Sequence, residues 1–120
     1  MVGERRLNIR TEERNGGNHL IVESEEGKMR GTSGQWRVLS HSAAGRGPSE
    51  IGRRLGISLS NTRNKLRLMY EQNIPTDIPE ISQGEALRRH AVKVGAISPN
   101  GRLNRKLSRA IVEDERLNKK

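Results

Sequence analysis

The feature that most constrains the fold is a pair of short helical patterns separated by Gly56-Ile57-Ser58. The first pattern follows Gly47-Pro48-Ser49, and proline suits the first turn of a helix because an N–H there has no partner within the helix. Glycine is common just past the end of a helix, and serine is a good N-cap for the next one. The sequence therefore predicts two consecutive helices that meet at a steep angle.

The apolar spacing on both sides of this turn predicts how the two helices pack. Ile51 and Leu55 lie four residues apart and share one helix face, and Ile57 is placed to fill the corner. In the second helix the expected buried stripe is Thr62, Leu66, Met69 and Tyr70. A small residue at Gly52 lets the second helix approach closely, and Gly56 permits a left-handed turn conformation.

Two further helices are expected around this pair. Thr32 and Gln35 have the spacing of a capping box, which predicts a helix that begins there and ends before the pair. Ser82 and Glu85 have the same spacing and predict a fourth helix. Residues 75–79 contain two prolines and are expected to form a linker between the pair and that fourth helix.

The two ends of the chain carry weaker patterns. Residues 1–31 alternate briefly around Asn15-Gly16-Gly17-Asn18, which suggests a short β-hairpin that either packs on the helices or forms an arm. Residues 98–120 begin with a turn and continue as a basic helix with apolar residues on one side. The predicted fold is all-α: a tetrahelical helix-turn-helix domain over residues 32–97, with the N-terminal hairpin or arm and an extra C-terminal helix.

Composition narrows the class of protein further. Apolar residues form 31% of the 120-residue chain, with no Phe, one Trp and one Tyr, so we expect a small aliphatic core and no large ligand pocket. The chain has no cysteine, which excludes disulfides and thiolate metal sites and fits a reducing, cytoplasmic location. No apolar run exceeds three residues, so neither a membrane span nor a secretory signal is expected.

The positive charge is concentrated in two segments. The formal net charge of +9 favours a polyanionic partner such as nucleic acid. Residues 32–74 hold seven basic and two acidic groups, and residues 98–120 hold seven and three, whereas residues 1–31 and 75–97 are balanced. A polyanion is therefore expected to contact the two basic segments.

The segment SEIGRRLGISLSNTRNKLRLMY, residues 49–70, resembles the helix-turn-helix of the LuxR/GerE-type transcription regulators. In that family the scaffold helix carries Glu-Ile, a small residue and then Arg-Leu-Gly-Ile-Ser, and Glu50-Ile51-Gly52 and Arg54-Leu55-Gly56-Ile57-Ser58 stand in those places. TSGQWRVLSHSAAGRGPSEIG resembles the family's first helix and SQGEALRRHAVKVGAI its fourth, usually a dimerisation helix, so the resemblance covers residues 32–97. The chain departs from the family at Thr62, where an apolar β-branched residue is usual, and in a longer link before the fourth helix.

The exposed face of the second helix of the pair supplies the candidate site, with Ser60, Arg63, Asn64 and Arg67 expected to line one stripe that faces a DNA groove. Arginine can bond guanine bidentately and asparagine can do the same with adenine, and the resemblance implies base reading by Arg63, Asn64 and Arg67. Phosphate contacts are expected from Arg53, Arg54, Lys65, Arg102, Arg105 and Lys106. The alternative is that these charges form only solvated helix faces.

Other groupings of residues indicate simpler roles. His19, His41 and His90 are far apart without a carboxylate at ligand spacing, so no metal ion, cofactor or catalytic site is expected. Gly45-Arg46-Gly47 lacks the preceding strand of a phosphate-binding loop and is expected to be an interhelical turn. Trp36 is expected in the core and not as a stacking platform.

The resulting hypothesis is a sequence-specific, double-stranded-DNA-binding transcription regulator without enzymatic activity, acting as a homodimer on two half-sites. RNA polymerase is a further candidate partner. Two other classes stay open: an interaction module that docks on RNA polymerase or on a viral DNA-packaging complex, and a basic RNA-binding protein. Binding to duplex DNA, structured RNA and single strands across salt concentrations distinguishes these classes.

Overall fold

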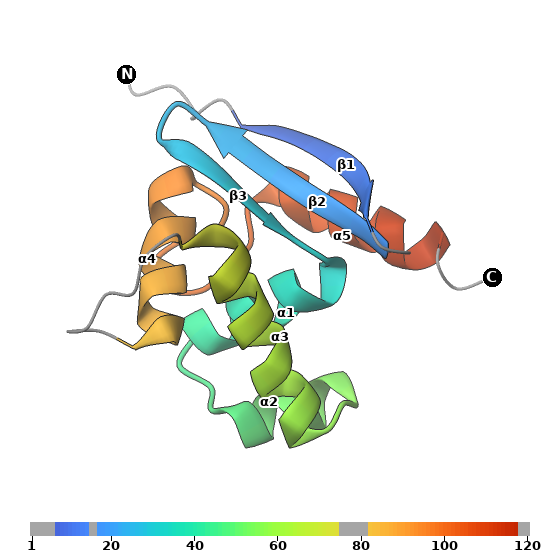
Figure 1. The fold of residues 1–120 in the computed structure, drawn as a ribbon, viewed down its shortest axis with the longest axis vertical. Helices are drawn as coiled ribbons and strands as arrows, with labels where there is room; N and C mark the ends of the chain where they lie inside the picture. The colour runs from blue at the N-terminus through green and yellow to red at the C-terminus, as the bar shows by residue number, and fades with distance from the viewer. Residues whose placement is uncertain (1–6, 15–16, 75–81, 118–120) are drawn as a thin grey trace.

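The computed structural model describes residues 7–14, 17–74 and 82–117, and in these residues three strands precede five helices (Figure 1). The strands form one antiparallel sheet in the order β1-β2-β3, with bounds β1 (Asn8–Arg14), β2 (Gly17–Ser24) and β3 (Gly27–Gly31). The helices are α1 (Ser33–Ala43), α2 (Pro48–Leu55), α3 (Leu59–Asn73), α4 (Gln83–Val94) and α5 (Arg105–Leu117). The linker predicted at residues 75–79 lies outside the described residues.

The all-α prediction is wrong, because the chain before α1 forms a three-stranded sheet and the fold is mixed α/β. β1 and β2 pair along their lengths as the predicted hairpin. The sequence does not predict β3, because its five residues include one large apolar side chain, Met29, and no period-two alternation marks them. β3 exists through its pairing with β2, which places Leu20 opposite Gly31.

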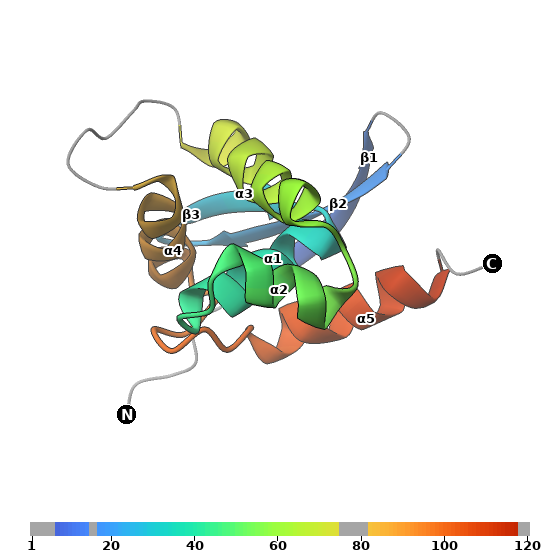
Figure 2. The ribbon, with the colours of Figure 1, turned by 90° about the horizontal axis from the view of Figure 1, so that it is seen from below.

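The inner face of the sheet packs on the helices and completes the hydrophobic core. Leu20, Val22 and Met29 are at most 1% exposed and belong to the same cluster as Trp36 of α1. The Trp36 indole Nε1 donates a hydrogen bond to the carbonyl oxygen of Leu20 at 3.2 Å, so its polar edge is satisfied inside the core. The prediction that Trp36 is a core residue is confirmed. Seen from below, the sheet lies behind α1 and α2 (Figure 2).

The helix ends that bound the predicted pair are confirmed. Pro48 is the first residue of α2, and Gly56 ends that helix in the left-handed conformation at φ 72°. Ser58 caps α3, because its Oγ accepts a hydrogen bond from the backbone N–H of Asn61 at 3.0 Å. α1 begins with the reciprocal capping box of Thr32. These capping and terminating residues act on backbone groups only a few positions away, so the local sequence is sufficient to specify the helix ends.

The packing between α2 and α3 is tightest at Gly52 and looser toward the free end of the pair. A Cβ atom at Gly52 would lie 2.7 Å from the carbonyl oxygen of Ile57, so the predicted need for a small residue there is confirmed. Leu55, Ile57 and Leu66 are half-buried and not enclosed. α2 contacts α1 and α3 and no other described element, so α2 and the start of α3 lie at the end of the molecule away from the sheet, whereas the end of α3 contacts β3 (Figure 1).

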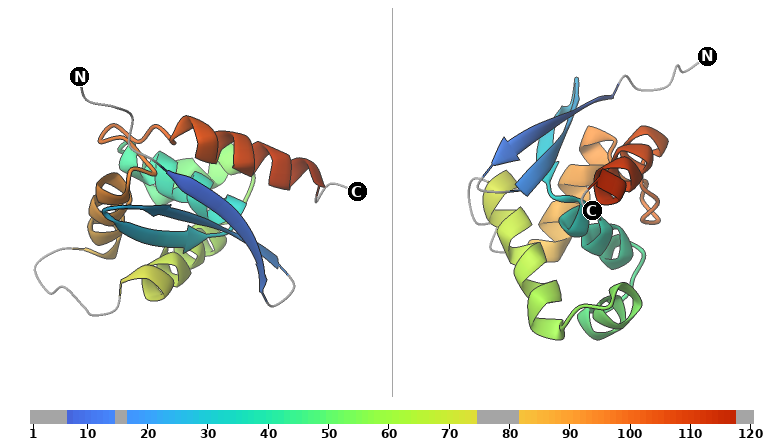
Figure 3. Two further views of the ribbon diagram at one scale, coloured as in Figure 1. Left: turned by 90° about the horizontal axis from the view of Figure 1, so that it is seen from above. Right: turned by 90° about the vertical axis from the view of Figure 1, so that its right-hand side faces the viewer.

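The last two helices complete the core from the other side. α4 buries Ala86, Leu87, Ala91 and Val94 within the chain, so these side chains are not available to a second copy. α5 contacts α1, β1 and β2 and runs along the side of the molecule opposite α3 (Figure 3). No helix in the described part of the chain is long and apolar enough to cross a membrane.

The turn before α5 is fixed to α1 by close backbone contact. Ser40 Oγ donates a hydrogen bond to the carbonyl oxygen of Gly101 at 2.6 Å. A Cβ atom at Gly101 would lie 2.6 Å from the backbone nitrogen of Ala44, so only glycine fits against α1 there. At the other end of α5 the buried Asp114 accepts hydrogen bonds from Ser33 Oγ at 2.5 Å and from Asn18 Nδ2 at 3.2 Å. Both ends of α5 are therefore held to the body of the protein.

Candidate nucleic-acid interface

α3 carries the candidate interface because one of its sides packs against the protein and the opposite side is exposed to solvent. Thr62 on the packed side is completely buried, and its hydroxyl donates a hydrogen bond to the carbonyl oxygen of Ser58 at 2.9 Å. The hydroxyl is thus satisfied, which explains how a polar residue is accommodated at this buried position. Opposite this side lie the four predicted base-reading residues, all of them exposed: Ser60, Arg63, Asn64 and Arg67.

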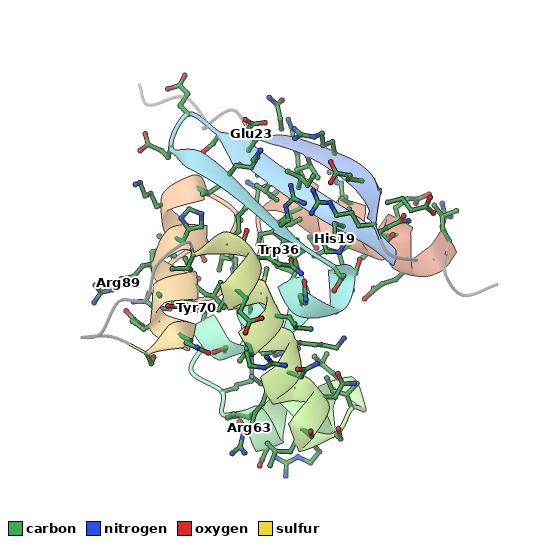
Figure 4. All side chains as sticks on the ribbon, viewed as in Figure 1. His19, Glu23, Trp36, Arg63, Tyr70 and Arg89 are labelled. Atoms are coloured by element: carbon green, nitrogen blue, oxygen red, sulfur yellow. The ribbon has the colours of Figure 1, made fainter. Side chains whose placement is uncertain are left out.

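These four residues share one surface, which we call the α3 face. Together with Ser58, Leu59 and Asn61 they line a shallow depression along the first half of the helix. Arg63 lies toward the end of the molecule farthest from the sheet (Figure 4). No described residue covers this face, since the four residues that define it are all exposed.

The side chains of the α3 face differ in how they are held. Arg67 is tied along the helix, with Nη2 at 2.5 Å from Asn64 Oδ1 and Nη1 at 3.3 Å from Glu71 Oε2. Arg63 makes no ion pair or side-chain hydrogen bond with any described residue. Arg63 can therefore meet an anion without losing a partner, whereas Arg67 and Asn64 must first exchange the bond between them.

The predicted phosphate-contacting residues near α3 are also held differently. Arg54 is neutralised by Glu50, with Arg54 Nε at 2.9 Å from Glu50 Oε2. Arg53 is exposed and makes no ion pair within the described residues. Lys65 extends beside the start of α1, where its Nζ lies 3.1 Å from the position that a Cβ atom of Gly34 would occupy. Arg53 and Lys65 therefore make no ion pair within the described residues, and Lys65 lies on the side of α3 that faces α1.

The three predicted phosphate contacts in the C-terminal segment are not brought to the α3 face. Arg102, Arg105 and Lys106 lie in the turn before α5 and in its first turn, and all three are exposed. α5 contacts neither α2 nor α3. Figure 2 shows α3 and α5 on opposite sides of the molecule, with α1 and α2 between them. The basic residues therefore form two separate surfaces.

The histidines take different environments and form no cluster. Burial, with a contribution from Arg46, lowers the pKa of His41, and Arg46 Nη1 lies 3.0 Å from His41 Nδ1. Because a guanidinium can only donate, this contact makes Nδ1 the acceptor and holds the ring neutral. Burial also lowers the pKa of His19, whose Nδ1 is enclosed and has no hydrogen-bond partner among the described residues. No group of three side chains that could hold a metal ion occurs in the described residues.

The outer face of the sheet is a charged surface that the sequence reasoning did not identify. Arg10 pairs with Glu23 at 3.0 Å, and Glu12 pairs with both Arg14 at 2.7 Å and Arg30 at 3.4 Å. The signal was the period-two spacing of Arg10, Glu12 and Arg14, which places all three on one side of a strand. Its arginines are largely neutralised by these pairs, in contrast to Arg63.

Comparison with known proteins gives no match: no protein-family model fits the chain, and neither a curated protein nor a solved structure is significantly similar to it. The interface is therefore defined here by its own geometry and charge.

Proposed function

We propose that the protein is a double-stranded-DNA-binding transcription regulator that inserts α3 into the major groove. The observation that carries this proposal is the α3 face, an uncovered helix surface that presents two guanidinium groups and a carboxamide. An α-helix fits the major groove, and these groups match the edges of guanine and adenine. The resemblance of residues 49–70 to LuxR/GerE-type regulators supports the same function.

The absence of exposed aromatic residues favours duplex DNA over single strands and RNA loops. The chain contains one Trp, one Tyr and no Phe, and Trp36 and Tyr70 are 0% and 6% exposed. Proteins that bind single-stranded nucleic acids commonly stack bases on aromatic side chains. Because neither aromatic side chain is exposed, recognition of duplex DNA through base edges in a groove and through phosphates fits this chain better than stacking on unpaired bases.

The individual roles follow from how each side chain is held. Arg63 is assigned to a guanine edge, and Asn64 and Arg67 to adjacent bases after they release each other. Ser60 lies closest to the start of the helix and contacts a base edge or the sugar-phosphate backbone. Arg53 and Lys65 are assigned to phosphates, and Arg54 joins them when it leaves Glu50.

We further propose that the regulator acts in the cytoplasm, without a cofactor or enzymatic activity, as a homodimer on two half-sites. Since the apolar stripe of α4 lies in the core, two copies must meet through another surface. Selection of bound sites from a random duplex pool tests the dimer directly, because a palindromic consensus requires two symmetric copies. A consensus with a single half-site contradicts it.

The class of ligand is tested by gel shift with duplex DNA, structured RNA and single-stranded DNA at increasing salt. A duplex-DNA regulator gives the tightest complex with duplex, a steep loss of affinity with salt, and a selected site that survives salt better than random duplex. Tighter binding of RNA, or equal affinity for all duplex sequences, contradicts the proposal. Capture of RNA polymerase in the absence of DNA supports the interaction-module alternative.

Substitutions on and beside the α3 face separate base reading from phosphate contact. Arg63→Ala and Arg67→Ala are each expected to weaken the selected site by about 1–3 kcal/mol and to relax its sequence preference. Lys65→Ala is expected to weaken selected and random duplex equally. Arg116→Ala, which removes an arginine already paired with Glu113, serves as the control. Equal losses on selected and random duplex for all three variants contradict the assignment of base readers.

A further inference from the structure

A second basic surface lies at the start of α5 and has no role in the α3 face. It consists of Arg102, Arg105, Lys106 and Arg109, which we call the α5 cluster, and all four residues are exposed. Residues 98–109 contain these four basic groups and no acidic residue. None of the four pairs with a carboxylate in the described residues, whereas Arg116 at the other end of the same helix pairs with Glu113.

The position of the α5 cluster is electrostatically unfavourable for the folded chain alone. The N-terminal end of a helix carries partial positive charge, which favours acidic residues in the first turn and disfavours basic ones. α2 and α4 follow this preference with Glu50 and Glu85, but α5 has Arg105 and Lys106 there and no acidic residue. Conflicts of this kind between local stability and sequence are expected where residues serve a function.

The α5 cluster and the α3 face lie on opposite sides of the molecule, and each faces outward. Leu107 and Ile111 face inward from α5, so the cluster faces outward. The view from below and the two views of Figure 3 agree that α1 lies between α3 and α5. The two surfaces are separated along the shortest dimension of the protein, whose extent is 26 Å, and also along its longest axis, because Arg63 lies at the end away from the sheet whereas α5 lies beside the sheet (Figures 1, 2 and 4).

One straight duplex cannot contact both surfaces. To do so it would have to turn back around the protein, and DNA resists bending over lengths well below its persistence length of about 150 bp. The elastic cost rises with the square of the bend angle, so a reversal of direction around so small a body is much less favourable than contact with a separate duplex. The arrangement therefore suits two duplex segments, one on each side.

Building on the proposed function, we infer that one copy of the protein bridges two DNA duplexes. The α3 face holds the first by its groove, and the α5 cluster holds the second by its phosphates, without base specificity. The cluster contains only guanidinium and ammonium groups, which bind phosphate oxygens, and no aromatic or carboxamide group that would stack on or read a base. The second duplex is consequently bound in a sequence-independent and salt-sensitive manner.

The test is a capture assay with two duplexes. A biotinylated duplex is fixed on beads, and the amount of a second, fluorescent duplex that the protein retains is measured at increasing salt. The variant Arg105→Gln/Arg109→Gln removes two charges from the α5 cluster. Its matched control, Arg89→Gln/Arg116→Gln, removes two arginines that are already paired with Glu85 and Glu113. Gel shift on a single duplex is measured for every protein in parallel.

Wild type and the control are expected to retain the fluorescent duplex. The α5 variant is expected to retain about tenfold less, with the salt dependence of capture reduced by about two in slope, because two phosphate contacts are lost. Its affinity for a single selected duplex should stay close to that of wild type. Equal capture by the α5 variant and wild type overturns the inference, since bridging would then come from two α3 faces in a dimer.

Failure of the inference is distinguishable from failure of the proposed function. If wild type shifts a single duplex but retains no second one, bridging is wrong and the α3 proposal stands. If wild type shifts no duplex at all, both are wrong. Replacing the fluorescent duplex by structured RNA gives one further outcome: preferential retention of RNA assigns the α5 cluster to a different polyanion and overturns bridging of DNA.

Discussion

Gly52 is the residue at which α2 and α3 come closest. A Cβ atom there would meet the carbonyl oxygen of Ile57 at 2.7 Å and the hydroxyl of Thr62 at 3.1 Å. The carbonyl belongs to the turn itself and cannot move without shifting the start of α3. The geometry of the helix pair, and with it the direction of the α3 face, therefore depends on this missing side chain.

Gly52→Ala is expected to lower the free energy of unfolding by about 1–3 kcal/mol, the usual cost of overpacking a core, despite the better helix propensity of alanine. Urea unfolding followed by circular dichroism measures this change. Gly84→Ala is the matched control, because its Cβ atom would have as its nearest neighbour Ser42 Oγ at 4.0 Å. That control should be neutral or more stable than wild type. A Gly52→Ala protein as stable as the Gly84→Ala protein contradicts the close contact.

For single residues, the sequence predicts which side chains of α3 are exposed better than it predicts which of them are bonded to each other. Helical periodicity correctly places Arg63, Asn64 and Arg67 on the side opposite Thr62, because both sides follow from one repeat. It does not predict that Arg67 is bonded to Asn64 and Glu71, since this depends on which rotamers the side chains adopt. The structure, unlike the sequence, shows that Arg67 is already bonded to neighbouring side chains whereas Arg63 is not.

Among the elements, α4 begins with a carboxylate that is bonded to two arginines. Ser82 Oγ accepts a hydrogen bond from the backbone N–H of Glu85 at 3.2 Å, as predicted. The Glu85 carboxylate does not complete the predicted capping box but binds Arg88 Nη2 at 2.6 Å and Arg89 Nε at 3.0 Å. Hydrogen bonds from Arg88 and then Arg89 lower the pKa of Glu85 from 4.5 to about 2.

This low pKa predicts a pH-dependent contribution of Glu85 to stability. Because the folded pKa lies below the unfolded one, the contribution is present above pH 4.5 and is lost as the pH falls toward 2. The melting temperature of wild type should exceed that of Glu85→Gln near neutral pH, and the difference should shrink across this range. Thermal unfolding at low ionic strength measures it, because salt screens an exposed pair.

Arg88→Gln/Arg89→Gln provides the control for that series. It removes the donors and keeps the carboxylate, so it should abolish the same pH-dependent difference. A gap between wild type and Glu85→Gln that stays constant from neutral pH to pH 2 contradicts a stabilising role for the ionised carboxylate.

The sequence predicts the helices whose ends are set by neighbouring residues. It does not predict β3 or the position of the turn before α5, because these depend on contacts with distant parts of the chain. Pro48, Gly56 and Ser58 act on neighbouring backbone groups, which is why the bounds of α2 and α3 follow from the sequence. β3 depends on pairing with β2, and its five residues carry little pattern of their own. The position of the turn at Gly101 likewise depends on its contact with α1, more than fifty residues earlier in the chain.

For the molecule as a whole, the sheet and the helices form one core. Leu20, Val22 and Met29 lie in the same cluster as Trp36, Leu39 and Leu87. The sequence predicts a helical domain over residues 32–97 and leaves open whether the N-terminal hairpin packs on it, because helical periodicity shows which face is apolar but not which element covers it. The strands cover part of that face.

Removal of residues 1–31 is therefore expected to prevent cooperative folding of the remaining chain. The loss of β2 and β3 would expose Trp36, which is 0% exposed in the full chain, and leave its Nε1 without the Leu20 carbonyl. Circular dichroism should show reduced helix content, and Trp36 fluorescence should shift to longer wavelength relative to the full chain. A truncated protein with native helix content and a sharp thermal transition contradicts a shared core.

The contact of Gly101 with α1 has a consequence for any assembly of DNA with many copies of the protein. α1 also contacts α2 and α3, so both proposed DNA-binding surfaces are attached to one helix without a flexible tether between them. A rigid protein that bridges two duplexes holds them at a constant separation. Duplexes gathered by such a protein would line up at a regular distance fixed by its own thickness, independent of base composition.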